Sequence, residues 1–239
     1  MDILIEKDEA GQIAVSVLAI SLAMGIFFAG VSGIFAYPKE FLLFLAPLFV
    51  TVGSGFILHE MAHKLAAIYY GVGARFRMWT TGLVAMLVTS LFGFLLAAPG
   101  AVVIYGRVDN RENGHIAVAG SLLNISLALF FLGLDHVAPV RMFFSFLAGF
   151  PAGTGFGIAS GILQVWRFGA AMNILLALFN MIPAFPLDGS KVFRWSLPAW
   201  LIVVAALLAM GSVLISPVIV FTWVMALVFF TFLSRMIFR

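Results

Sequence analysis

The sequence predicts an all-α polytopic membrane protein with about six transmembrane helices and short membrane-associated β-strands. Of its 239 residues, 64% are hydrophobic and 10% are charged, and the mean hydropathy of +1.17 lies far above the soluble globular range. A transmembrane helix needs about 20 apolar residues, and stretches of that length recur from Ile13 almost to the C-terminus. We therefore expect one integral membrane domain over residues 1–239, with its core at about 41–191 and no soluble regulatory domain.

The N-terminus and the composition further limit the topology, the possible metal ligands and the possible partners. The first residues, "MDILIEKDEA", lack the basic start and cleavage site of a signal peptide, so the first apolar stretch is expected to remain as a helix. Cysteine is absent, which leaves His, Asp and Glu as the ligands for any metal site. The net charge of +3 comes from Lys and Arg in short loops, as expected beside membrane spans, and we expect no nucleic-acid partner.

The first half of the chain contains two spans and two strands. The spans are expected at about 13–36 and 41–70, separated by the turn signal "AYPKE". The segments "ARFRMW" and "AVVIYG" predict short strands at the membrane surface. The apolar stretch at 82–98 either crosses the membrane or dips in and returns. Loop charge favours a return, because the nearby arginines then share one side with those near the C-terminus, which the positive-inside rule makes cytoplasmic.

The second half of the chain contains further spans. We expect them at about 115–134 and 162–181, followed by two final spans that separate near Ser216 and Pro217. Between the first two lies "FLAGFPAGTGFGIASG", which is too rich in glycine for a regular helix and is interpreted as a partial span.

The segment "HEMAH" places ionisable side chains inside an apolar span. A spacing of four residues puts His59 and His63 on one face of a helix, about one turn apart, so that both imidazoles can reach a single cation. In this pattern the histidines bind zinc, and the glutamate, here Glu60, takes a proton from the zinc-bound water.

A third ligand is needed, and Asp188 is the natural one. Among the ten acidic residues, only Glu60 and Asp188 lie well inside apolar surroundings, where ionisable groups usually mark function. The remaining acidic residues lie at the N-terminus, beside spans or in the polar loop, and we expect solvated side chains for Asp2, Glu6, Asp8, Glu9, Glu40, Asp109, Glu112 and Asp135. His115 and His136 are both next to span ends and receive no metal role.

"HEMAH" followed much later by "NMIPAFPLDG" resembles the site-2 protease family of intramembrane zinc metalloproteases. The second motif is the more telling one, with its elements in the family order at Asn180, Pro183, Pro186, Leu187, Asp188 and Gly189. The family's Gly-Pro-two-any-Asn pattern matches at Gly120 and Asn124 but has Ser121 where proline is usual. The resemblance covers about 58–191.

The resemblance implies roles for single residues. His59, His63 and Asp188 would bind one zinc ion per chain, and Glu60 would be the catalytic acid/base. Asn180 would hold the substrate or the developing oxyanion, with a helix–helix hydrogen bond as the alternative for it and, more so, for Asn124. The two strands resemble the family's membrane-associated sheet, whose edge presents backbone groups to an extended substrate.

The function expected from these features is hydrolysis of peptide bonds within or near transmembrane segments of other proteins, in the cell membrane and from the cytoplasmic side. The partners would be a transmembrane substrate and the lipid bilayer. The first alternative is a multi-pass metal transporter with an intramembrane His/Asp zinc site, although transport needs no glutamate in "HEMAH". Others are an inactive protease-like scaffold and a zinc peptidase that trims prenylated proteins.

Overall fold

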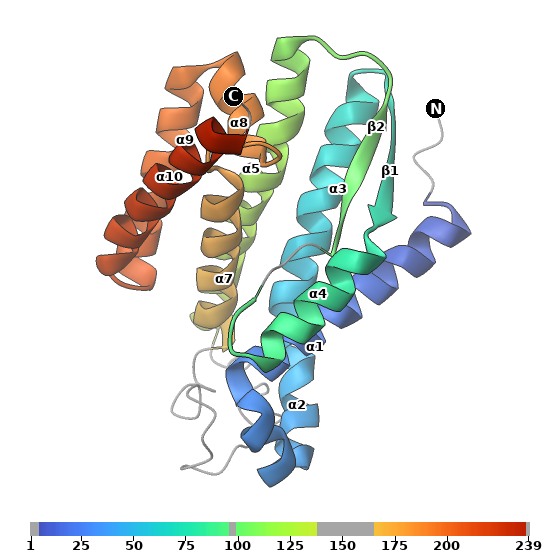
Figure 1. Cartoon of the computed structure of the whole chain (residues 1–239), viewed down its shortest axis with the longest axis vertical. Helices are drawn as coiled ribbons and strands as arrows, with labels where there is room; N and C mark the ends of the chain where they lie inside the picture. Colours follow the sequence, from blue (N-terminus) through green and yellow to red (C-terminus); the bar gives the residue numbers. More distant parts are fainter. Residues whose placement is uncertain (1–4, 96–98, 138–164, 238–239) are drawn as a thin grey trace.

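The computed structural model describes residues 5–95, 99–137 and 165–237, and these are mostly helical (Figure 1). The N-terminal part contains α1 (Lys7–Ala36), α2 (Pro38–Leu48), the π-helix η1 (Phe49–Gly53) and α3 (Ser54–Tyr69). It is followed by β1 (Gly73–Met78), α4 (Thr80–Leu91), β2 (Gly100–Tyr105) and α5 (Asn110–Asp135). The C-terminal part contains α7 (Val165–Asn180), α8 (Asp188–Trp195), α9 (Leu197–Leu214) and α10 (Val218–Ile237).

The helices that are long enough to span a membrane only partly match the spans expected from the sequence. Within the described residues, 4 helical stretches are long and apolar enough to cross a bilayer: Lys7–Ala36, Pro38–Tyr69, Asn110–Asp135 and Leu197–Leu214. Three other apolar helices, α4, α7 and the apolar part of α10, have 10–17 residues and are shorter than a typical span. The helical membrane fold with two strands is confirmed, whereas the number of about six spans is not. The glycine-rich partial span lies outside the described residues.

The two strands form an antiparallel pair that decides how the segment between them runs. Phe76 lies opposite Val102, and Met78 at the end of β1 lies opposite Gly100 at the start of β2. Just beyond the pair, Trp79 N donates to Pro99 O at 3.3 Å. Because its two ends meet, the segment that contains α4 begins and ends at the sheet.

The second span contains a π-helical turn, η1, directly before α3. Pro47, inside α2, has no N–H to donate, and Thr51 Oγ1 donates to its carbonyl oxygen at 2.7 Å. Ser54 Oγ donates in the same way to Val50 O. Serine and threonine hydroxyls thus satisfy carbonyls where the helical pattern changes, and π-turns of this kind are frequent at functional sites.

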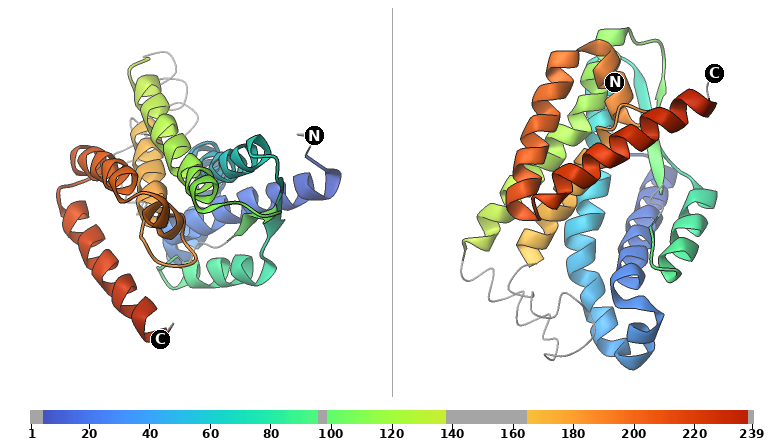
Figure 2. Two further views of the ribbon diagram at one scale, coloured as in Figure 1. Left: turned by 90° about the horizontal axis from the view of Figure 1, so that it is seen from above. Right: turned by 60° about the vertical axis from the view of Figure 1, so that its left-hand side comes forward.

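Two apolar clusters lie on either side of α3. The first joins α5, α7, α9 and α10 around Trp166, Ile174, Leu178 and Trp200. The second joins α1, α2, α3, α4 and β1 through residues such as Phe56, which lies edge-on to Phe76. In Figure 2, α9 and α10 accordingly lie on one side of the molecule and α1 on the other. The sheet, α8 and the start of α5 share the upper end in Figure 1.

Candidate metal centre

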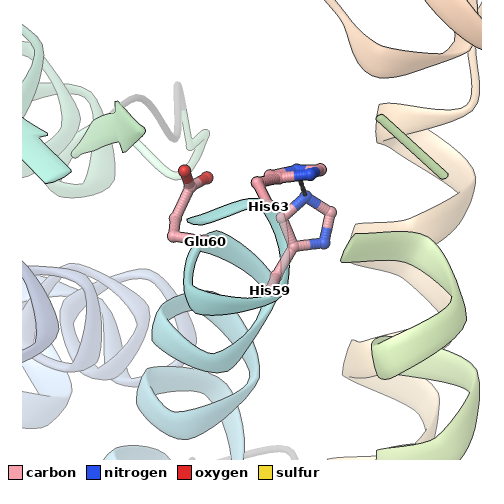
Figure 3. Close-up of side chains that lie close together, drawn as sticks. All are labelled: His59, Glu60 and His63. Atoms are coloured by element: carbon pink, nitrogen blue, oxygen red, sulfur yellow. Dashed lines mark hydrogen bonds between the residues drawn. The ribbon is translucent and has the colours of Figure 1, made fainter. Parts of the chain in front are cut away.

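The two histidines of "HEMAH" meet on one face of α3, as Figure 3 shows. Their Nε2 atoms lie 3.0 Å apart, and the two rings are perpendicular with centroids at 4.6 Å. Both side chains belong to buried residues, with 2% of His59 and 8% of His63 exposed. The four-residue spacing therefore places both imidazoles on one face of the helix, as the helical geometry predicts.

Asp188 joins the histidines from a different part of the chain. It is the first residue of α8, and its Oδ2 lies 2.9 Å from His63 Nε2 and 3.4 Å from His59 Nε2. Lys191, one turn further along α8, donates to the other carboxylate oxygen at 2.9 Å. One carboxylate oxygen thus faces the imidazoles while the second is held from outside, which fixes the orientation of the carboxylate.

Two glycines make this close approach sterically accessible. A Cβ at Gly189, directly after Asp188, would lie 2.3 Å from the Met181 carbonyl group, so α8 can begin against the end of α7 only with glycine there. A Cβ at Gly120 of α5 would lie 2.6 Å from His59 Nε2 and 2.7 Å from His63 Cε1. Any side chain at Gly120 would therefore enter the space of the imidazoles.

Hydrogen bonds on the far side of each ring fix which nitrogen faces the centre. His63 Nδ1 lies 2.7 Å from Ile116 O, a carbonyl that only accepts, so the proton is on Nδ1. His59 Nδ1 lies 2.5 Å from Asn124 Oδ1. That amide is oriented by its nitrogen, which donates to Gly55 O at 3.1 Å, so its oxygen faces His59 and must accept.

The side chain of Asn173 on α7 completes this arrangement, and the sequence did not single it out. Its Oδ1 accepts from Asn124 Nδ2 at 2.8 Å, and its own nitrogen donates to Gly169 O at 2.8 Å and Thr51 O at 3.4 Å. Asn124 and Asn173 are 0% and 1% exposed. Both belong to one buried network that orients His59, and the signal available in the sequence was a lone amide within the apolar segment of α7.

The donor set fits a zinc ion. With protons on both Nδ1 atoms, two Nε2 lone pairs and one carboxylate oxygen converge within 2.9–3.4 Å of one another. Three electron-rich atoms repel each other at this range unless a proton or a metal cation lies among them. Two imidazole nitrogens with one carboxylate oxygen form a ligand set of catalytic zinc sites, and their outer nitrogens usually donate to carbonyl or carboxamide groups as seen here.

Glu60 lies beside this set, on the side of α3 that faces the sheet (Figure 3). Ligand atoms of His59, Glu60 and His63 all lie within 4.8 Å of one another. Glu60 Oε2 accepts from Val102 N of β2 at 2.8 Å. The strand thus holds one carboxylate oxygen of Glu60. The Glu60 carboxylate lies near the two Nε2 atoms, but, unlike the carboxylate of Asp188, it does not point toward them.

Asn180 ends α7 at the wall of a cleft of about 570 Å³, which the histidines, Glu60, Asp188 and residues of β2 also line. Its Nδ2 donates to Leu176 O at 3.0 Å within the same helix. This bond differs from the interhelical contact considered for it from the sequence. Its expected role toward substrate stays a prediction.

Two acidic residues expected to be solvated are buried. Glu9 is 1% exposed and pairs with Lys64, and Asp135 is 6% exposed and pairs with Arg167. The expectation of solvation is wrong for both, because each has a cationic partner on another helix, far along the chain. His115 forms a hydrogen bond with the Tyr70 hydroxyl.

Comparison with known proteins identifies the family. The model of peptidase family M50 matches residues 47–216. The chain belongs to family M50. This family comprises the site-2 proteases, so the resemblance seen in the two motifs is confirmed.

Two proteins of Methanocaldococcus jannaschii are similar to this M50 chain. The candidate zinc metalloprotease MJ0611 is 37% identical over 194 residues, which cover 80% of this chain and 86% of that protein. The zinc metalloprotease MJ0392 is 25% identical over 152 residues, or 64% of this chain and 34% of the relative. No solved structure matches the chain. Membership of M50 and these names support a membrane metalloprotease.

Proposed function

We propose that this M50 protein is an intramembrane zinc endopeptidase that hydrolyses a peptide bond within or near a transmembrane segment of another protein. One observation carries the proposal: His59 and His63 of α3 and Asp188 of α8 converge beside Glu60 in a cleft. A buried set of three ligands with a nearby carboxylate is the arrangement that metal-assisted hydrolysis requires.

The three metal ligands and Glu60 have different roles in the proposed hydrolysis. A zinc ion held by His59, His63 and Asp188 would acidify a bound water and polarise the scissile carbonyl. Glu60 takes the proton of the attacking water while the new C–O bond forms. It then gives that proton to the leaving nitrogen as the C–N bond breaks, so that a carboxylic acid and an amine result. The bond from Val102 N occupies Glu60 Oε2, and Oε1 has no hydrogen bond to the described residues and can make this transfer.

The outward edge of β2, where Glu60 binds the N–H of Val102, is the proposed place for the substrate backbone. β1 cannot take this role where its outward N–H groups donate to α1, from Phe76 to Glu9 at 2.9 Å and from Met78 to Gln12 at 3.0 Å. Residues 100–104 of β2 instead line the cleft beside the metal ligands. A helical substrate hides its peptide groups in its own hydrogen bonds, so it must unwind before an edge strand can bind it.

Asn180 is proposed to contact the bound substrate from the opposite wall of the cleft. Its Nδ2 now donates to Leu176 O, and the same group can donate to a carbonyl or oxyanion if the side chain rotates. A carboxamide donor suits that charge.

The proposed location is the cell membrane, with several spans and the active site near the cytoplasmic side. Arg75 and Arg77 belong to β1, and Lys191 and Arg194 belong to α8, the helix that begins with Asp188; both elements lie in the upper part of Figure 1. Cationic residues concentrate on the cytoplasmic side of membrane proteins. We propose transmembrane proteins and the bilayer as the partners.

The test uses the purified full chain in proteoliposomes with a set of synthetic single-span peptides that carry Gly and Pro at different depths. The wild type should cleave some of them inside the apolar segment, as read by mass spectrometry. Glu60→Gln should bind zinc and cleave none, while the control Glu40→Gln, at the start of α2, should match the wild type. Equal cleavage by Glu60→Gln would refute its role. Zinc flux without cleavage would favour the transporter.

A further inference from the structure

A buried ion pair joins the active-site helix to α1 directly beside the metal ligands. Lys64, the residue after His63, donates to both carboxylate oxygens of Glu9 at 2.7 Å. Lys64 is 4% exposed and Glu9 is 1% exposed. Neither residue belongs to the metal centre, and Glu60 and the three ligands make no use of this pair.

Glu9 also holds the sheet. Its Oε1 accepts from Phe76 N of β1 at 2.9 Å. One turn later, Gln12 accepts from Met78 N at 3.0 Å, so two side chains of α1 bind alternate outward N–H groups of the strand. Figure 1 shows α1 passing beside β1. The sheet is thereby fixed to α1, and through Lys64 it is fixed to α3.

These contacts form a closed path that starts and ends on α3. It runs from Lys64 through Glu9 to Phe76, which lies opposite Val102 in the sheet. Val102 N then donates to Glu60 Oε2 at 2.8 Å. Because Phe76 and Val102 direct their N–H groups outward, they form a non-hydrogen-bonded pair, and the ladder bonds between the strands are left to their neighbours.

Simple attachment of α1 to α3 does not require this pair. Removing two charges from water costs about as much as their attraction returns, so well-packed apolar residues would hold the helices equally well. The Glu9 carboxylate binds the Lys64 ammonium through both oxygens and at the same time accepts the strand N–H, which an apolar side chain cannot do. The feature specific to Glu9 is therefore the link between α3 and the sheet.

We propose that Glu9 and Lys64 are positioning residues that set the place of the sheet relative to α3. They thereby hold the outward edge of β2 and the Glu60 carboxylate in register with the metal ligands. The catalytic part of this inference rests on the proposed function. The structural part concerns the sheet alone and can be tested without any substrate.

The deciding variant reverses the pair, as Glu9→Lys/Lys64→Glu. Charge reversal restores the attraction between α1 and α3, but an ammonium at position 9 cannot accept from Phe76 N. We expect the amides of 73–78 and 100–105 to exchange hydrogen about twofold to tenfold faster than in the wild type, the range that corresponds to one lost hydrogen bond. Wild-type exchange in both strands would overturn the proposal.

Two further variants keep the test decisive if the reversed chain folds poorly. Gln12→Leu leaves the ion pair intact and removes only the acceptor of Met78 N, so faster exchange should begin at that end of β1. The control reverses another interhelical ion pair, as Asp135→Arg/Arg167→Asp, in which buried Asp135 of α5 meets the exposed Arg167 of α7. Equal loosening of the sheet in this control, or none in Gln12→Leu, would contradict the proposed link.

Zinc content and kinetics separate this inference from the proposed function. The reversed pair should keep the wild-type zinc content, because its substitutions leave His59, His63 and Asp188 in place. On a cleaved single-span peptide, KM should rise severalfold because the binding edge is displaced, and kcat should fall because Glu60 loses its place beside the metal ligands. Wild-type values of both KM and kcat would overturn the positioning role. If the wild type cleaves no peptide at all, the proposed function fails while the exchange result still decides the structural part.

Discussion

Replacing Gly120 by alanine should separate metal binding from folding. A Cβ at this position would lie 2.6 Å from His59 Nε2 and 2.7 Å from His63 Cε1, whereas ordinary contacts begin at 3.4 Å. The imidazoles would have to move by about 0.8 Å, several times the roughly 0.2 Å that zinc–ligand distances tolerate. We expect zinc affinity to fall about 100-fold, the upper range for changes around metal ligands.

The same substitution should not weaken the helix itself. Alanine in place of glycine inside a helix favours folding by up to about 1 kcal/mol. In the presence of a chelator, the thermal midpoint of Gly120→Ala should therefore be close to that of the wild type. Zinc should then stabilise the wild type strongly and the variant weakly, because the stabilisation depends on affinity.

The assay is chelator competition for zinc together with thermal unfolding in detergent. Gly133→Ala is the matched control on the same helix, since a Cβ there meets no atom of the described residues within 4 Å. It should bind zinc as the wild type does. Unchanged zinc affinity in Gly120→Ala would refute the argument that Gly120 makes room for the imidazoles.

Two other substitutions test the buried polar groups around the centre. Asn173→Leu should weaken zinc binding about tenfold in the competition assay, because Asn124 loses the partner that helps to orient its amide toward His59; unchanged affinity would contradict this. Ser121→Ala should raise the free energy of unfolding by about 1 kcal/mol, because its buried hydroxyl has no hydrogen-bond partner among the described residues; a clear loss of stability in denaturant titrations would contradict it.

Local patterns in the sequence were sufficient for much of the site. The "HEMAH" spacing determines one helical face without knowledge of the fold, and the structure brings His59 and His63 together there. Asp188 stood out because few acidic residues lie in apolar surroundings, and it is indeed 7% exposed. The strands were visible from their residue types, whereas their register became visible only in the structure, because residues 79–99 with α4 lie between them.

The features that could not be predicted from the sequence depend on contacts between segments that are far apart in the chain. Glu9 looked solvated because its neighbours are polar, yet its partner Lys64 lies within the second span, which no local pattern reveals. Asn173 resembles any amide in an apolar helix until Asn124 is placed beside it. Hydropathy marks apolar stretches but not where helices end, so the expected number of spans exceeded the number of long helices in the described residues.

Zinc per chain in the purified protein tests the central claim most directly, because it needs no substrate. We expect about one zinc ion in the wild type and much less in Asp188→Ala, since a site of this type needs its third ligand. Asp109→Ala, at the start of α5, serves as the control and should keep its zinc. A well-folded wild type without zinc, or undiminished zinc in Asp188→Ala, would contradict the metal centre described for α3 and α8.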